Sequence, residues 1–282
     1  MEKKLVGEGK VVLLAGGGKC YTDIAARFVS SERTVEEIIN SPYTPKIVKN
    51  ILDRGHMAAT EFDTFIFGIE GYSRVTEVQM VRKRIGSSYL IKSGRTELNG
   101  KRSYELVIPE EIQDVPFEYS IDAKNILIGD PDDPQNLKDV LGVRSVTAKL
   151  TAEDLMRMGE IYYEAALALG IDEQFIRYLK PQGTGFKAIV QMNVRVLLEF
   201  FAERCCACAQ PEIQDLARKM LAIVKPLQPD LFVNGGAKCI KLNYCPENSG
   251  QFKTCKGKIP THTEVIAAYE SSRAMKNESK SV

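Results

Sequence analysis

The order of strand and helix signals along the chain is the feature that most limits its fold. Strand patterns are concentrated in the first half, where Phe65, Phe67 and Ile69 recur at every second position of FDTFIFGI (62–69). Such alternation is typical of a strand with one buried face. Helix signals dominate the second half. Because strands followed by helices favour segregated layers over alternating βαβ units, we expect an α+β fold.

Residues that cap or break helices indicate where these elements begin and end. Thr44 and Pro45 suit the start of a helix, and Gly55 suits its end. Thr151 and Asp154 have the spacing of a capping box. The expected strands are a short one within 1–20, followed by a glycine-rich turn, and those at 62–69 and 103–109. The expected helices cover about 22–31, 45–54, 73–85, 151–169, 172–179, 187–208 and 211–225.

Length and charge limit the class of protein. The chain has 282 residues and a net charge of +1, so it is long enough for a buried core and has no global field for nucleic acid or a membrane. The apolar run from Val11 to Ala15 is too short for a signal peptide or a membrane span. We expect a cytoplasmic protein with one α+β domain over 1–235 and a cysteine-containing C-terminal extension over 236–282.

The segment VVLLAGGGK (11–19) invites a nucleotide-loop interpretation. It lacks the G-x-G-x-x-G pattern of dinucleotide-binding loops, and Lys19 is followed by Cys20 instead of the Ser or Thr of a phosphate-binding loop. We interpret it as a glycine turn after a strand.

Seven cysteines, an odd number in a chain without an export signal, favour reduced thiols. Cys239, Cys245 and Cys255 show no C-x2-C spacing, which is the usual arrangement in zinc and iron–sulfur sites. We therefore expect no metal site, with a cysteine-bound metal as the alternative. The CCAC segment (205–208) lies at the end of an expected helix, where free cysteines mostly serve as small buried residues.

Two segments rich in cations, 79–95 and 177–210, are candidates for a binding site. Charge runs are usually solvated helix faces, and Arg195, Glu199 and Glu203 have the i, i+4 spacing of ordinary surface ion pairs. Another face of the same expected helix is mostly apolar yet carries an amide and a guanidinium, and a partly buried arginine needs an anion or an acceptor. The residues of this face are Asn193, Leu197, Phe200, Arg204 and Cys208.

In the first of these segments, Gln79, Arg82 and Lys83 fall on one side of the expected helix. A loop with Ser93, Gly94 and Arg95 follows. Donors at a helix end together with such a loop suit a phosphate and a pyrimidine ring.

Several blocks of sequence together resemble the flavin-dependent thymidylate synthase family. RGHMAATEFDTFIFGI (54–69) and SRVTEVQMVRKRIGSS (73–88), with SGR at 93–95, resemble its signature region. GIDEQFIRYLKP (170–181) and MNVRVLLEFFAERCCACAQPEIQDLA (192–217) resemble its C-terminal helices. SYELVIP (103–109) fits the strand after the signature region, and AARFVSS (25–31) fits more weakly. Blocks in register are more specific than a single motif.

The resemblance implies an α+β fold with a central, mostly antiparallel sheet flanked by long helices. It also implies a homotetramer whose active sites are shared between subunits. Members of the family bind FAD, take reducing equivalents from NADPH and transfer a one-carbon unit from methylenetetrahydrofolate to C5 of dUMP, which gives dTMP. The implied partner is thus a small nucleotide, with neither nucleic acid nor membrane.

For the nucleotide, the resemblance implies that Arg204 lies at the N3/O4 edge of the uracil. A permanent cation there would stabilise negative charge on the ring and make C5 nucleophilic. Arg204 and Ser93 are the implied catalytic residues. The implied nucleotide-binding residues are Gln79, Arg82, Ser93, Gly94, Arg95, Arg177 and Arg204, of which Ser93, Gly94 and Arg95 would surround the phosphate.

For the flavin, the resemblance implies contacts from three segments of the chain. His56 and Glu61 would line the flavin and folate side, and Asn193 and Arg195 would contact FAD. The implied cofactor-binding residues are His56, Glu61, Arg82, Lys83, Arg84, Ile85, Asn193 and Arg195.

The chain departs from the family at Lys83, since Arg-Lys-Arg replaces Arg-His-Arg. This change adds a charge and removes a flat ring beside the flavin. The interval from Arg84 to Ser93 is one residue longer, so Ser87 or Ser88 is the alternative equivalent of the functional serine. These differences leave open a divergent flavoenzyme that modifies a different pyrimidine nucleotide, or a non-catalytic oligomer that binds nucleotide or RNA.

Overall fold

A computed structural model describes residues 3–5, 7–93, 105–122, 145–247, 255 and 259–278 of the chain. It divides into two compact units, a smaller one of residues 1–6 and 93–185 and a larger one of residues 7–92 and 186–282. The division into a domain over 1–235 and an extension over 236–282 stays a prediction.

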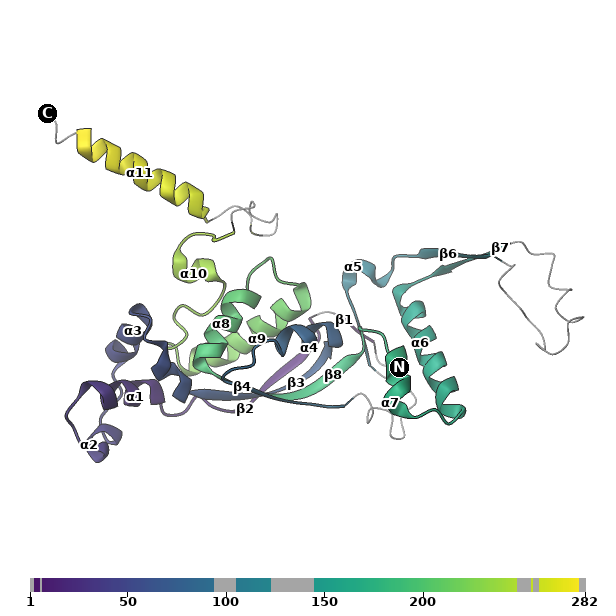
Figure 1. The fold of residues 1–282 in the computed structure, drawn as a ribbon, viewed down its shortest axis with the longest axis horizontal. Coiled ribbons are helices and arrows are strands. Elements are labelled where there is room, and N and C mark those ends of the chain that lie inside the picture. Colours follow the sequence, from purple (N-terminus) through teal and green to yellow (C-terminus); the bar gives the residue numbers. More distant parts are fainter. Residues whose placement is uncertain are drawn as a thin grey trace, which may run out of the picture. The chain divides into compact units, whose positions relative to one another are not determined.

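The larger unit is built on a four-stranded sheet with the strand order β2-β3-β8-β4 (Figure 1). Strand β2 pairs antiparallel with β3, and β4 pairs antiparallel with β8. The predicted α+β fold with a mostly antiparallel sheet is therefore confirmed. The strands are β2 (Lys10–Ala15), β3 (Thr64–Ser73), β4 (Ser87–Ile91) and β8 (Gly185–Asn193).

Helices α4, α8 and α9 cover one face of this sheet (Figure 1). Helices predicted over 22–31, 45–54 and 211–225 are present with bounds shifted by two residues or fewer. The helices of the larger unit are α1 (Tyr21–Ser30), α2 (Val35–Ile39), α3 (Pro45–Asp53), the 3-10 helix η1 (Met57–Phe62), α4 (Arg74–Met80), α8 (Val194–Arg204), α9 (Pro211–Leu227), α10 (Lys238–Leu242) and α11 (His262–Glu278). Among the described residues, no helix is long and apolar enough to cross a membrane.

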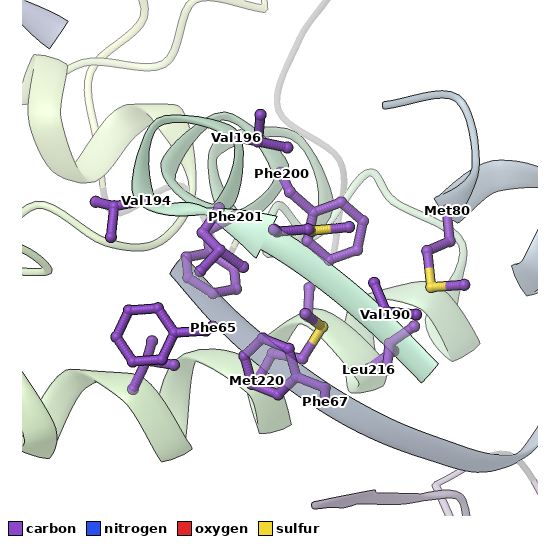
Figure 2. Packing of buried hydrophobic residues seen from close by; sticks show 14 of the residues in the cluster. Phe65, Phe67, Met80, Val190, Val194, Val196, Phe200, Phe201, Leu216 and Met220 are labelled. Carbon is purple, nitrogen blue, oxygen red and sulfur yellow. The ribbon is translucent and has the colours of Figure 1, made fainter. Parts of the chain in front are cut away.

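The core of the larger unit lies between the sheet and the helices α8 and α9 (Figure 2). Phe65 and Phe67, which alternate along β3 as predicted, are fully buried. They face Phe201 of α8 and Met220 of α9 in the same cluster (Figure 2). The ring of Phe232 meets Phe65 edge-on at 5.6 Å between centroids, a geometry that aromatic pairs prefer.

The long helix predicted over 187–208 is wrong in its first part, because residues up to Asn193 form strand β8. Buried Ala188, Val190 and Met192 alternate there with exposed residues, so the period is two and not 3.6. Asn193 ends the strand and caps the helix, since its Oδ1 accepts the Val196 N–H at 3.0 Å. Helix α8 is therefore shorter than predicted.

The helix predicted from Ser73 to about Ile85 is also shorter, since α4 ends at Met80. Ser73 does not cap it with its side chain, because the Ser73 hydroxyl and backbone N–H both donate to the buried Glu212 carboxylate. A loop and the unpredicted strand β4 follow. Gln79, Arg82 and Lys83 thus do not share one side of a helix, which corrects the prediction.

The turn after β2 is a structural glycine turn, as predicted. Gly16 and Gly17 have φ angles of +117° and +79°, which favour glycine. The following helix start is occupied by the protein itself, since the buried Asp63 carboxylate accepts the backbone N–H groups of Tyr21 and Thr22 at 2.9 and 2.7 Å. An anion at this helix N-terminus would have to displace Asp63.

The smaller unit contains two short pairs of strands and a long helix. The capping box at Thr151 and Asp154 is confirmed, and Gly170 follows the helix with a φ of +73°. The pairs are β1 (Lys3–Leu5) parallel to β5 (Leu106–Ile108), and β6 (Phe117–Asp122) antiparallel to β7 (Ser145–Leu150). Its helices are α5 (Glu110–Gln113), α6 (Ala152–Ala168), α7 (Glu173–Ile176) and the 3-10 helix η3 (Arg177–Leu179).

We predict that Phe200→Ala lowers the free energy of unfolding by about 3–5 kcal/mol, because it removes a fully buried ring and leaves a cavity. Chemical denaturation at one fixed protein concentration measures this change. The control is Phe62→Ala, whose ring is 66% exposed, and we expect it to change stability by less than about 1 kcal/mol. Equal losses in the two variants would contradict the assignment of the core.

Candidate functional site

The loop over residues 81–86 joins α4 to β4 and is held by its neighbours. The Tyr89 hydroxyl donates to the backbone carbonyls of Met80 and Lys83 at 3.1 and 2.8 Å, and the Ser87 hydroxyl also donates to the Lys83 carbonyl. Gly86 has a φ of +74°, and a Cβ there would lie 2.5 Å from the Asn193 side-chain nitrogen. The loop therefore requires glycine at this position.

Two guanidiniums of this loop are directed to solvent. Arg82 and Arg84 are exposed, and neither forms an ion pair or hydrogen bond with another described residue. Ile85, which lies between Arg84 and Gly86, is 90% exposed. Such exposure is unusual for a large apolar side chain. The loop thus presents two cations and one apolar side chain to a ligand.

Lys83 has a different environment from the arginines on either side. Its Nζ lies 2.8 Å from Glu203 Oε1 and 3.6 Å from Glu199 Oε2, and its side chain is only 19% exposed. The ammonium that replaces the family's histidine is therefore neutralised by α8. It ties the loop to the last turn of that helix.

A second ion pair joins η1 to the start of α8. Arg195 lies 2.6 Å from Glu61 and 3.7 Å from Glu199, so the predicted i, i+4 pairing along α8 is confirmed. Glu203, the third residue predicted in this i, i+4 series, pairs with Lys83 instead. Glu61 and Arg195, both predicted to line a cofactor, contact each other in this structure.

The predicted helix face from Asn193 to Cys208 is only partly correct. Leu197 and Phe200 are fully buried on one face of α8, and Arg204 is the last residue of the helix. Asn193 is the cap before the helix, and Cys208 lies beyond its end. Only the central part of the face is therefore helical.

Arg204 is the half-buried cation that the sequence indicated. Its Nε is buried and has no hydrogen-bond partner among the described residues. The side chain lines a cavity of about 370 Å³ together with Arg218 and residues of the CCAC segment. A buried donor of this kind requires an acceptor, which a ligand can provide.

His56 lines another cavity of the larger unit, with a volume of about 540 Å³. Asn50, Arg54 and Phe62 contribute to the same cavity, which lies between α1, α3 and η1. His56 itself is exposed. Glu61 and Arg195 do not line this cavity, so the structure does not group His56 with them there.

The remaining predicted residues are distributed over both units. Gln79 lies on α4, where its Nε2 donates to the Val75 carbonyl at 3.4 Å. Ser93 and Arg177 are exposed and belong to the smaller unit. Gly94 and Arg95 lie outside the described residues. Of the alternative serines, Ser87 holds the loop and Ser88 is exposed on β4.

Sequence reasoning missed the residues that shape the loop. Gly86 and Tyr89 were not candidates, and Glu199 and Glu203 were interpreted as surface partners of Arg195 alone. A glycine directly before a period-two segment was the available signal for Gly86. Nothing in the sequence pairs Lys83 with Glu203, because the two are 120 residues apart.

Comparisons with known proteins identify the family of this chain. A family model described as thymidylate synthase complementing protein (Thy1) matches residues 16–230, a range that includes every predicted site residue. The flavin-dependent thymidylate synthase of Nitratidesulfovibrio vulgaris is 30% identical over 262 residues, which cover 88% of this chain and 90% of that protein. The enzyme of the same name from Pyrococcus abyssi is 34% identical over 215 residues, which cover 75% and 76%.

A solved structure has the same fold. The UMP/dUMP methylase PolB from Streptomyces cacaoi, crystallised with 5-Br dUMP, matches with a TM-score of 0.58. The match covers 84% of this chain and 98% of that one at 17% sequence identity. At this identity the likeness concerns the fold alone.

We predict that Lys83 and Glu203 are energetically coupled. A double-mutant cycle with Lys83→Met and Glu203→Gln should give a coupling of about 1 kcal/mol, because the pair is well shielded at the lysine. Denaturant unfolding of the four proteins measures it. The matched control is the Lys187–Glu70 pair at 3.2 Å, whose side chains are 70% and 40% exposed and for which we expect a coupling near zero. A coupling energy between Lys83 and Glu203 no larger than that of the control pair would contradict this ion pair.

Proposed function

The chain belongs to the flavin-dependent thymidylate synthase family, and on that premise we propose that it transfers a one-carbon unit from methylenetetrahydrofolate to C5 of dUMP. The reaction would depend on FAD, use NADPH as the reductant and give dTMP. The one-carbon unit would be reduced to a methyl group by two electrons that originate from NADPH, and C5 would lose its hydrogen. The protein would thus be a methyltransferase of nucleotide biosynthesis.

The observation that carries this proposal is the ion pair between Lys83 and Glu203. Arg82 and Arg84 flank the lysine, and Arg204 directly follows the glutamate. The 2.8 Å contact therefore brings two cationic segments together although they are far apart in the sequence. Guanidiniums that lack protein acceptors suit the phosphate groups of a nucleotide and of FAD.

The residues present also fit a flavin. Arg82 and Arg84 would bind its phosphates, and exposed Ile85 would offer an apolar surface to its rings. Gly86 lets the backbone approach Asn193 closely, and the amide nitrogen of Asn193 remains available after its oxygen has capped α8. When bound, FAD would supply the redox chemistry that the side chains of this chain lack.

The chain's own contribution to the chemistry would be electrostatic. Arg204 would donate to the N3/O4 edge of the uracil and stabilise the negative charge that makes C5 nucleophilic. A guanidinium suits this role because it stays protonated and its donors have a fixed geometry. Gln79, Arg177 and the loop from Ser93 would orient the nucleotide, and Glu61 with Arg195 would line the cofactor.

The location and assembly of the protein are part of the same proposal. All seven cysteines are free in the structure, which supports a reducing compartment such as the cytoplasm. The outer face of the sheet carries exposed Val12, Leu14, Leu90 and Ile189 around a cavity of about 710 Å³. A large exposed apolar patch is typical of an interface. This face supports the proposed homotetramer, whose subunits would share active sites.

Lys83 is the observation that favours a second candidate. Lys83 stands where the family has a histidine, so the side chain beside the proposed flavin site would carry a charge and lack a flat ring. This difference would suit another pyrimidine or another one-carbon outcome. The second candidate is therefore a divergent flavoenzyme acting on another pyrimidine nucleotide.

The decisive experiment supplies the purified chain with FAD, NADPH, methylenetetrahydrofolate and dUMP without oxygen. We expect dTMP to form, and we expect Arg204→Ala to reduce turnover by more than about 100-fold while FAD stays bound, because the cation acts on the ring. Chromatography measures dTMP, and the flavin spectrum measures bound FAD. Bound FAD without dTMP would favour the second candidate, which a screen of UMP and dCMP then tests.

Arg157→Ala serves as the control for Arg204→Ala. Arg157 lies on α6 and pairs with Glu153 one turn away, with 45% of its side chain exposed. We expect turnover close to that of the unaltered protein. If turnover survives in Arg204→Ala at the level of this control, the role assigned to Arg204 is wrong.

The proposed interface predicts that a charge on the outer sheet face breaks the assembly. Leu90→Glu, at a side chain that is 72% exposed, should convert the tetramer to smaller species, because burying the carboxylate would be costly. Size-exclusion chromatography with light scattering measures the mass. Leu169→Glu, at a side chain 79% exposed in the smaller unit, is the control and should leave the mass unchanged. A tetramer that survives Leu90→Glu would place the interface elsewhere.

A further inference from the structure

One cavity in the larger unit is lined by six of the seven cysteines of the chain. It is the cavity of about 370 Å³ next to Arg204. The thiols come from segments that are far apart in the sequence, namely the end of α8, helix α10 and the segment that follows it. The lining cysteines are Cys205, Cys206, Cys208, Cys239, Cys245 and Cys255. Such convergence on one cavity is not explained by core packing, because only Cys205 is buried.

Four of the thiols that line this cavity come from both sides of α9 in the sequence. Cys206 precedes that helix, and Cys239, Cys245 and Cys255 follow it.

The surroundings of the cavity suit an anionic centre. Arg204, Arg218 and Lys238 line it, against the carboxylates of Glu203 and Glu247. The buried Nε of Arg204 still lacks a hydrogen-bond partner among the described residues. Donors that reach the sulfurs of a metal centre stabilise its negative charge.

The segment that carries three of these cysteines has little other anchorage. Helix α10 is five residues long and contains no buried residue. Cys245 is held by backbone hydrogen bonds to Pro260 and His262 at 2.8 and 3.1 Å. Short segments without a core of their own are commonly stabilised by a bound metal, whose binding energy becomes folding energy.

We propose that Cys206, Cys239, Cys245 and Cys255 bind an iron–sulfur cluster through their thiolates. Soft thiolate ligands select zinc or iron–sulfur centres, and four cysteines complete either. The cavity is many times larger than a single ion requires, and its cysteines come from separate segments of the chain, which suits a cluster in which each thiolate binds a different iron.

Loading the cluster requires some movement and the loss of protons. Among the residues that the structure describes, no three His, Cys, Asp or Glu side chains are arranged to hold a single ion. The four thiols must therefore rotate into the cavity as the cluster assembles, and each releases a proton. This inference replaces the expectation from C-x2-C spacing that the chain has no metal site, since the fold gathers cysteines that the sequence separates.

The test is the metal content of the full chain, purified without oxygen and reconstituted with ferrous iron and sulfide. We expect equal amounts of iron and acid-labile sulfide, about four of each per chain. Cys239→Ser and Cys245→Ser should each lower the bound iron at least tenfold. Cys20→Ser, whose thiol lies outside the cavity beside Asp63, is the matched control and should retain the iron. Cys208→Ser should also retain it.

A residue-level measurement keeps the test decisive if a variant fails to fold. Alkylation of the loaded, unaltered chain followed by peptide mapping should show Cys206, Cys239, Cys245 and Cys255 protected, and oxidation with a chelator should expose all four. Exposed Cys208 should react in both states. A chain that binds no iron, one zinc ion per chain in place of iron and sulfide, or iron retained in both Cys239→Ser and Cys245→Ser would each overturn the proposal.

Discussion

The packing of α8 against the four-stranded sheet is the constraint on which the larger unit depends. Leu197, Phe200 and Phe201 of this helix are fully buried and share one core cluster with Phe65 and Phe67 of β3. The ring of Phe201 also meets that of Phe232 in the loop after α9. Because interiors are close-packed, this contact fixes both the rotation and the position of α8 along its axis. The positions of its polar residues, from Arg195 to Arg204, are therefore fixed by a rigid helix.

The junction between β8 and α8 connects this packing to the proposed binding site. Asn193 caps the helix and also packs against Gly86, a position that only glycine fits. The Lys83–Glu203 pair joins the same loop to the other end of the helix. The loop with Arg82 and Arg84 is thus held at two points, so its guanidiniums are placed without being neutralised. A ligand that binds there would bind more tightly, because the fold already orders these cations and binding need not pay that entropic cost.

The end of α8 has two neighbours with different chemistry. Arg204 provides a guanidinium for the proposed uracil site, and the cysteines that follow it line the cavity proposed to hold an iron–sulfur cluster. The planar guanidinium has five donors, so its fork and its Nε can serve different partners. Arg204 lines the cysteine cavity and would also contact the nucleotide in the proposed uracil site.

The sequence by itself determined the class of fold and the local elements with strong signals. The alternation along β3, the capping box at Thr151 and the Pro211 helix start were all correctly predicted, since they depend on nearby residues. The family, and with it the candidate site residues, also followed from sequence blocks in register. Tertiary structure decided that residues 185–193 form a strand, because its neighbours β3 and β4 complete its hydrogen bonds. It also decided that Lys83 pairs with Glu203 and that distant cysteines share one cavity. Such contacts join segments more than 30 residues apart, and no local pattern encodes them.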